Sequence, residues 1–155
     1  MVQRRLLVLL GLCATAVFAV SATIWGADEP AAAQHEGHNA HMQHCGKVCA
    51  DCMLACESCA RHCAHEVAAG HKDHMTTLGT CADCGDICAT AAKLCAREGP
   101  FAVTLCEACA KACATCGAAC GKFPDDKHMA ECAKICLDCE KVCRDMIEQA
   151  GKTSK

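Results

Sequence analysis

The chain has 155 residues, a formal net charge of −3 and 20 Cys, and its aromatic residues are three Phe and one Trp. The length allows one domain, and the mild charge with scattered Lys and Arg argues against nucleic acid as a partner. From residue 34 onward only 14 of 122 residues are Val, Leu, Ile or Phe, too few for an ordinary hydrophobic core. Either the chain does not fold alone, or its cysteines form the core.

Residues 1–33 are predicted to be an export signal peptide and its cleavage region. Arg4 and Arg5 precede an apolar run that is too short to span a bilayer comfortably. The arginine pair resembles a twin-arginine signal, although its neighbours depart from that pattern and a general secretory signal also fits. Cleavage after Ala22 or Ala33 would leave the mature protein exported, in the bacterial periplasm. An uncleaved N-terminal anchor is the alternative.

Residues 34–43 are predicted to form a His-rich linker that passes into the first helix. Histidine recurs every third residue here, at His35, His38, His41 and His44. These side chains fit either a first contact for an arriving metal ion or a solvated linker.

One cysteine, Cys13, falls in the signal, and the other 19 recur every three or four residues in four clusters. This spacing places side chains on the inward face of a helix in a bundle, whereas a strand would alternate with a period of two. The longest gap, between Cys88 and Cys95, keeps the same phase with Ala91 at the skipped position. The clustered residues are Cys45, Cys49, Cys52, Cys56, Cys59, Cys63, Cys81, Cys84, Cys88, Cys95, Cys106, Cys109, Cys113, Cys116, Cys120, Cys132, Cys136, Cys139 and Cys143.

Gly and Pro between the clusters are expected to separate four helices. The expected helices cover residues 44–69, 71–97, 101–121 and 125–150. Short connections make successive helices antiparallel. The sequence therefore predicts an all-α fold, an antiparallel up-down-up-down four-helix bundle with a Cys-lined core over residues 44–151.

Such a core could hold disulfides or metal ions. Side chains three or four residues apart on a helix lie about 5–6 Å apart at Cβ, too far for a disulfide within one helix, which needs about 3.8 Å. Disulfides between different helices are an alternative, and they would make the chain a disulfide-stabilised structural exported protein. A redox enzyme is not expected, because a catalytic Cys-x-x-Cys pair lies at a helix N-terminus.

Among metals, the continuous seams favour many low-coordinate ions over separate sites of four ligands. Thiolates select soft ions such as Cu(I), whereas structural zinc takes four ligands and iron–sulfur clusters take discrete sets. We therefore expect multiple Cu(I) ions. A general thiolate sink for zinc or cadmium, like a metallothionein, is the alternative.

The segments CGKVCADCMLACESCARHC, CADCGDICATAAKLC, CEACAKACATC and CAKICLDCEKVC resemble those of bacterial copper storage proteins. The resemblance covers residues 42–150. It implies Cu(I) bound by the core cysteines, many ions per protomer and a homotetramer of bundles. It also implies storage or sequestration of copper, with a copper-requiring enzyme or chaperone as a possible partner.

Copper must enter at a bundle end, and one end gathers several histidines with Met129. His74 and Met129 are in phase with the cysteine seams and are expected to point inward as entrance ligands. His128 and His71 are further candidates for the entrance. His62 and His65, at the same end, fit either the entrance or a solvated face.

The opposite end of the predicted bundle carries His41, Met42 and Met146, together with the apolar residues Phe101, Val103, Leu105 and Ile147. We expect these apolar side chains to plug that end.

Overall fold

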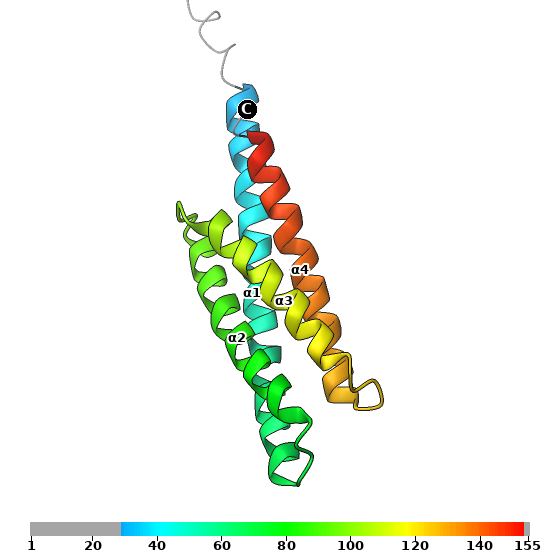
Figure 1. Cartoon of the computed structure of the whole chain (residues 1–155). Helices are drawn as coiled ribbons and strands as arrows, with labels where there is room; N and C mark the ends of the chain where they lie inside the picture. The colour runs from blue at the N-terminus through cyan, green and yellow to red at the C-terminus, as the bar shows by residue number, and fades with distance from the viewer. Residues whose placement is uncertain (1–28, 154–155) are drawn as a thin grey trace, which may run out of the picture. The chain divides into compact units, whose positions relative to one another are not determined.

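The computed structural model describes residues 29–153, and the side chains of residues 40–152. These residues form four helices without a strand: α1 (Glu29–Ala68), α2 (His74–Ala96), α3 (Ala102–Cys120) and α4 (Lys127–Thr153). From residue 34 onward, successive helices run in opposite directions (Figure 1). The expected all-α, up-down-up-down four-helix arrangement is therefore confirmed. The predicted signal lies, apart from its last five residues, outside the described residues.

The chain reverses between α1 and α2 at Gly70, whose φ is +107°. The amide of Gly70 donates to the carbonyl of Val67, and the amide of His71 donates to the carbonyl of Glu66. This pair of bonds is a Schellman motif, in which the left-handed residue is normally Gly. The turn uses the next residues as well, so α2 begins at His74 and not at residue 71 as predicted.

The largest difference from the expected boundaries is at the start of α1. The helix begins at Glu29, so residues 34–43 are helical and do not form the expected linker. Three consecutive alanines at residues 31–33 precede this segment, and Ala is the strongest helix former. Pro30 lies in the first turn, where a missing N–H costs no hydrogen bond.

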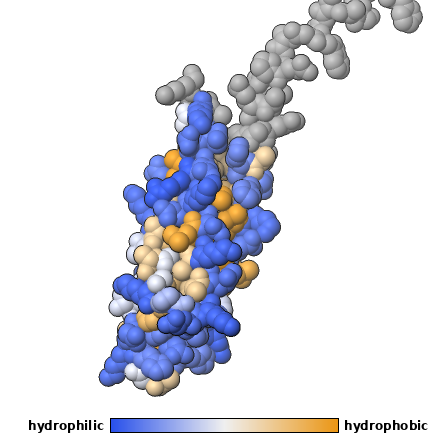
Figure 2. Space-filling model, turned by 90° about the vertical axis from the view of Figure 1, so that its right-hand side faces the viewer, coloured by the Kyte–Doolittle hydropathy of each residue, from blue (hydrophilic) through white to orange (hydrophobic). Residues whose placement is uncertain are grey.

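The interior of the bundle consists mainly of cysteine. All 19 clustered cysteines are at most 2% exposed, and Ala91 and Ala102 fill gaps between them. Several larger apolar side chains, including Leu54, Phe101 and Leu137, lie on the surface instead. On the face drawn in Figure 2, hydrophilic residues predominate and apolar ones reach the surface in small groups. The small cysteine side chain thus replaces Val, Leu and Ile as the core residue.

α3 is also long and apolar enough to cross a membrane by length and composition. Its cysteine face is buried inside the bundle. Its apolar character is therefore accounted for by its place in the core.

Candidate metal centre

The sulfur atoms of the four helices form one continuous column along the bundle. Near one end, Sγ of Cys95 lies 3.5 Å from that of Cys106, which lies 3.6 Å from Cys45. Near the other end, Sγ of Cys81 lies 3.6 Å from Cys120. Neighbouring sulfurs between these ends are separated by 3.5–4.0 Å, and most of the pairs join different helices. The seams predicted from the spacing therefore meet in a shared interior.

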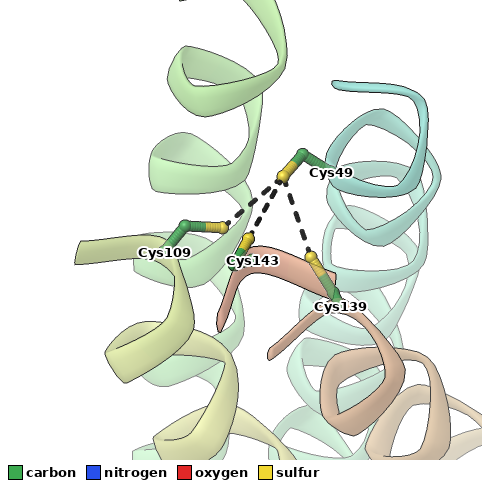
Figure 3. Close-up of side chains that lie close together, drawn as sticks. All are labelled: Cys49, Cys109, Cys139 and Cys143. Carbon is green, nitrogen blue, oxygen red and sulfur yellow. Dashed lines mark hydrogen bonds between the residues drawn. The ribbon is translucent and has the colours of Figure 1, made fainter. Parts of the chain in front are cut away.

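Figure 3 shows one part of this column, where three sulfurs from two other helices surround Cys49 of α1. Its Sγ lies 3.8 Å from Cys109 of α3, and 3.9 and 3.6 Å from Cys139 and Cys143 of α4. All four thiols point toward one another. The four sulfur atoms lie within 4.8 Å of one another, close enough to share a metal ion.

These cysteines are free thiols. The Sγ–Sγ distances of 3.5–4.0 Å exceed the S–S bond length of about 2.05 Å. None of these 19 cysteines is therefore joined to another in a disulfide, and their sulfur atoms are available as metal ligands.

The groups of four cysteines overlap, and this decides which metals they suit. Cys52 belongs to at least two such groups, and so do Cys56 and Cys132. Tetrahedral zinc with Zn–S bonds of about 2.3 Å would fit the sulfur spacing of one group. It would not fit all groups at once, because neighbouring zinc sites would compete for the same thiolates. Ions with two or three ligands, joined by shared sulfurs, can use the whole column.

Charge favours the same conclusion. Among the described residues, the buried polar side chains are His74 and Thr77, and no Lys or Arg is buried with the thiols. Thiolates that form when metal binds must therefore be neutralised by the metal, because buried unpaired charge is costly. A zinc ion with four thiolates keeps two negative charges, whereas one monovalent ion per thiolate leaves none.

At the mouth end of the column, burial keeps the thiol of Cys63 protonated. The pKa of Cys63 is raised to about 12, because burial desolvates its thiolate and because the neighbouring Cys59 would repel a second negative charge. Since metal-bound sulfur is deprotonated, each ion that enters must displace protons from the column.

Met129 continues the column at the end where α1 meets α2, which we call the mouth. Its Sδ lies 3.5 Å from Sγ of Cys59 and 3.7 Å from Sγ of Cys63, and the side chain is fully buried. His74 is 6% exposed, and its Nδ1 is buried without a hydrogen-bond partner. The spacing had predicted that both residues point inward, and their burial confirms it.

The other two predicted entrance residues lie nearer the surface. His128 is exposed, and its ring stacks on that of His62 with centroids 4.7 Å apart. His71 is exposed and forms a hydrogen bond with Glu66. His128 thus contacts another histidine of the mouth, His62. His71 is held by Glu66 at the edge of the mouth.

Two mouth residues were missed by the sequence analysis. Phe123 stacks on His74 with ring centroids 4.0 Å apart and so covers it. Asp126 bonds His62 at 2.6 Å, and its other oxygen accepts backbone N–H groups of His128 and Met129. Although burial alone would raise it, the pKa of Asp126 is lowered by these hydrogen bonds. The position of Asp126 just before the last helix was an available signal for a helix N-cap.

A pocket of about 190 Å³ opens between α1 and α4 beside the mouth. His128, Glu131 and Ser58 lie on its wall, and so does Cys132 of the core. The sulfur column therefore comes close to the surface here.

The expected apolar plug at the opposite end, which we call the far end, is wrong for Phe101. Phe101 is 66% exposed, because it precedes α3 and does not turn inward. Val103, Leu105 and Ile147 are only partly buried. Met42 and Met146 close this end instead, both buried in the core. Their signal was in the spacing, since Met42 lies three residues before Cys45 and Met146 three after Cys143.

Comparisons with known proteins agree with this geometry. The sequence model of a family described as copper storage protein matches residues 38–148. An uncharacterized cysteine-rich protein of Bacillus subtilis (strain 168), YhjQ, is 38% identical over 106 residues, which cover 68% of this chain and 95% of the relative.

Two solved structures are similar over nearly their whole length. The Cu(I)-bound copper storage protein BsCsp3 superposes with a TM-score of 0.63 at 36% identity, covering 69% of this chain and 98% of that one. A cytosolic copper storage protein from Streptomyces lividans, with five coppers, gives a TM-score of 0.67 at 27% identity, covering 73% and 97%.

Proposed function

Because the chain belongs to the copper storage protein family, we propose that its core cysteines bind several Cu(I) ions and that the protein stores or sequesters copper. The observation that carries this proposal is the continuous sulfur column, beside which no Lys or Arg is buried among the described residues. The 19 clustered cysteines are the proposed ligands. No catalytic role is proposed, because the family is one of copper storage proteins and the clustered thiols are buried in the core.

The test is an anaerobic titration of the reduced protein with Cu(I) against a chromophoric chelator, together with a count of free thiols. Storage predicts nearly all thiols free before loading and roughly one copper for every one to two cysteines, since low-coordinate Cu(I) sites share thiolates. A capacity of roughly one metal per four cysteines would favour zinc. Few free thiols would favour a disulfide-stabilised structural protein.

We further propose that copper enters at the mouth, through His74 and Met129 with His128 and His71 nearer the surface. Thioether and imidazole ligands hold Cu(I) more loosely than thiolate does, which suits an entrance. The contacts of Met129 with Cys59 and Cys63 support a direct transfer into the column. Replacing His74 and Met129 together by Ala should slow copper uptake, and an unchanged uptake rate would contradict this role.

We also propose that the protein is exported to the periplasm, which depends only on the sequence of residues 1–33. Folding with reduced thiols before export would protect them from oxidation, which suits a twin-arginine route. A fusion of this segment to a reporter, followed by cell fractionation, tests the proposal. Lys in place of Arg4 and Arg5 should stop export by a twin-arginine route but not by the general secretory route.

A homotetramer of bundles is proposed from the family resemblance. Leu54 of α1 and Leu137 of α4 are exposed, at 63% and 51%, and are candidates for contacts between bundles. Light scattering of the purified protein measures the assembly state. Replacing both leucines by Lys should lower the number of protomers in the assembly if these residues lie in the interface. Delivery to a copper-requiring enzyme or chaperone remains part of the proposed role.

A further inference from the structure

The far end of the sulfur column is closed by side chains that can themselves bind copper. Met42 and Met146 continue the cysteine seams of α1 and α4 beyond their last thiols, and their exposures are 7% and 2%. Like Met129 at the mouth, each offers a soft thioether sulfur next to the thiols. A purely apolar closure would have been made by Leu or Phe, which cannot bind a metal ion.

A surface pocket lies over Met146. It has a volume of about 340 Å³ and opens between α1 and α4. His41 and His44 line it from α1, and Met146 lines it from α4. Met146 therefore belongs both to the wall of this pocket and to the buried core.

The two imidazoles are the available donors in this pocket. Of the carboxylates on its wall, Asp145 is paired with Lys141 and Glu148 with Lys152, both at 2.7 Å. Within the part of the chain whose side chains are described, neither His41 nor His44 forms a hydrogen bond or an ion pair, and both are exposed. Imidazole is a suitable copper ligand when it is not otherwise engaged.

Thiols lie directly below the methionines. Sγ of Cys45, one turn after Met42, lies 3.8 Å from Sγ of Cys143, one turn before Met146. Cys106 and then Cys95 follow at 3.6 and 3.5 Å. Imidazole, thioether and thiol ligands thus succeed one another from the surface to the column.

We infer that the far end is a second port for Cu(I), at which His41 and His44 receive the ion and Met146 and Met42 pass it to Cys45 and Cys143. This inference rests on the proposed copper storage. An ion that enters only at the mouth must move past every occupied site to reach the far thiols. A port at each end lets both halves of the column fill and empty independently.

The test compares initial rates of anaerobic Cu(I) uptake from a copper–bicinchoninate complex. The starting protein carries the substitutions His74→Leu and Met129→Leu, which remove the metal ligands of the mouth. To this protein we add Met42→Leu and Met146→Leu, which nearly conserve side-chain volume. The remaining rate of uptake should fall roughly tenfold or more. The double closure is needed because copper can enter by either end as long as the other one is open. The control substitution is Met53→Leu, at a methionine off the seam, which should leave the remaining uptake unchanged.

A second variant guards against disturbed packing. His41 and His44 are exposed, so replacing both by Ala in the mouth-closed protein should leave the fold intact, as circular dichroism can check, and should also slow uptake. The second port is overturned if the mouth-closed protein takes up copper at the same rate whether or not the methionine pair or the histidine pair of the far end has been replaced. The equilibrium capacity separates this result from failure of the proposed function: a protein that binds full copper at an unchanged rate lacks only the second port, whereas one that binds no copper is not a store.

Discussion

Asp126 connects the start of α4 to the histidines of the mouth. One carboxylate oxygen accepts the backbone N–H groups of His128 at 2.9 Å and Met129 at 3.2 Å, and the other bonds His62. Asp126→Ala should lower the free energy of unfolding of the apo protein by about 1 kcal/mol, the usual effect of losing a helix N-cap. Chemical denaturation measures this change. Asp126→Asn keeps a capping oxygen and serves as the control, and equal losses in the two variants would contradict the capping role.

The raised pKa of Cys63 makes the stability of the apo protein depend on alkaline pH. The pKa of Cys63 is about 12 in the folded protein, against 9.0 for a free thiol. Folding therefore retains a proton that the unfolded chain loses as pH rises above about 9. Stability from this group is fully present below pH 9 and is lost progressively as pH rises toward 12.

Denaturation of the reduced apo protein between pH 8 and pH 11 tests this dependence. Cys63→Ala removes the titrating group and should make the loss of stability with pH shallower. A midpoint of unfolding that stays constant across this range would show that the buried thiol of Cys63 does not resist ionisation.

At the scale of single elements, the two Schellman turns make a matched comparison. Gly70 ends α1 with a φ of +107°, and Glu98 ends α2 in the equivalent position with a φ of +52°. Only Gly adopts such angles without strain. Glu98→Gly should therefore stabilise the protein by about 0.5–1 kcal/mol, while Gly70→Ala should destabilise it by about 1 kcal/mol. Thermal unfolding of the two apo variants measures both effects, and a destabilising Glu98→Gly would contradict the strain.

The helices and their inward faces could be predicted because cysteine spacing carries the helical period directly. The same rule places Met129 and His74 inside, as observed. It does not determine where a helix begins when no cysteine marks the boundary, and so the start of α1 at Glu29 was missed. Phe101 was misplaced for a related reason, because hydrophobicity alone does not fix the direction of a side chain at a helix start.

At the scale of the whole molecule, the core combines dense burial with small side chains. The cysteines bury little apolar area each, so the hydrophobic contribution per helix is smaller than in a Leu-rich bundle. The sulfur atoms are nevertheless held 3.5–4.0 Å apart by close contact of the helices. At Gly46, for example, an added Cβ would lie 3.1 Å from that of Cys95. Close packing of the helices therefore brings the ligands of different helices together.

This arrangement predicts that copper strongly stabilises the folded protein. Ligands that bind only the folded state raise its free energy of unfolding by about 2.7 kcal/mol per site when present at one hundred times the dissociation constant. Several Cu(I) ions joining four helices should add such contributions, so the melting temperature should rise stepwise with copper content. Anaerobic thermal unfolding at increasing copper, followed by chelator removal that restores the apo value, measures this. Cys52→Ser with Cys113→Ser, in the middle of the column, should reduce the gain. Equal melting temperatures for apo and loaded protein would mean that copper binds outside the thiol core.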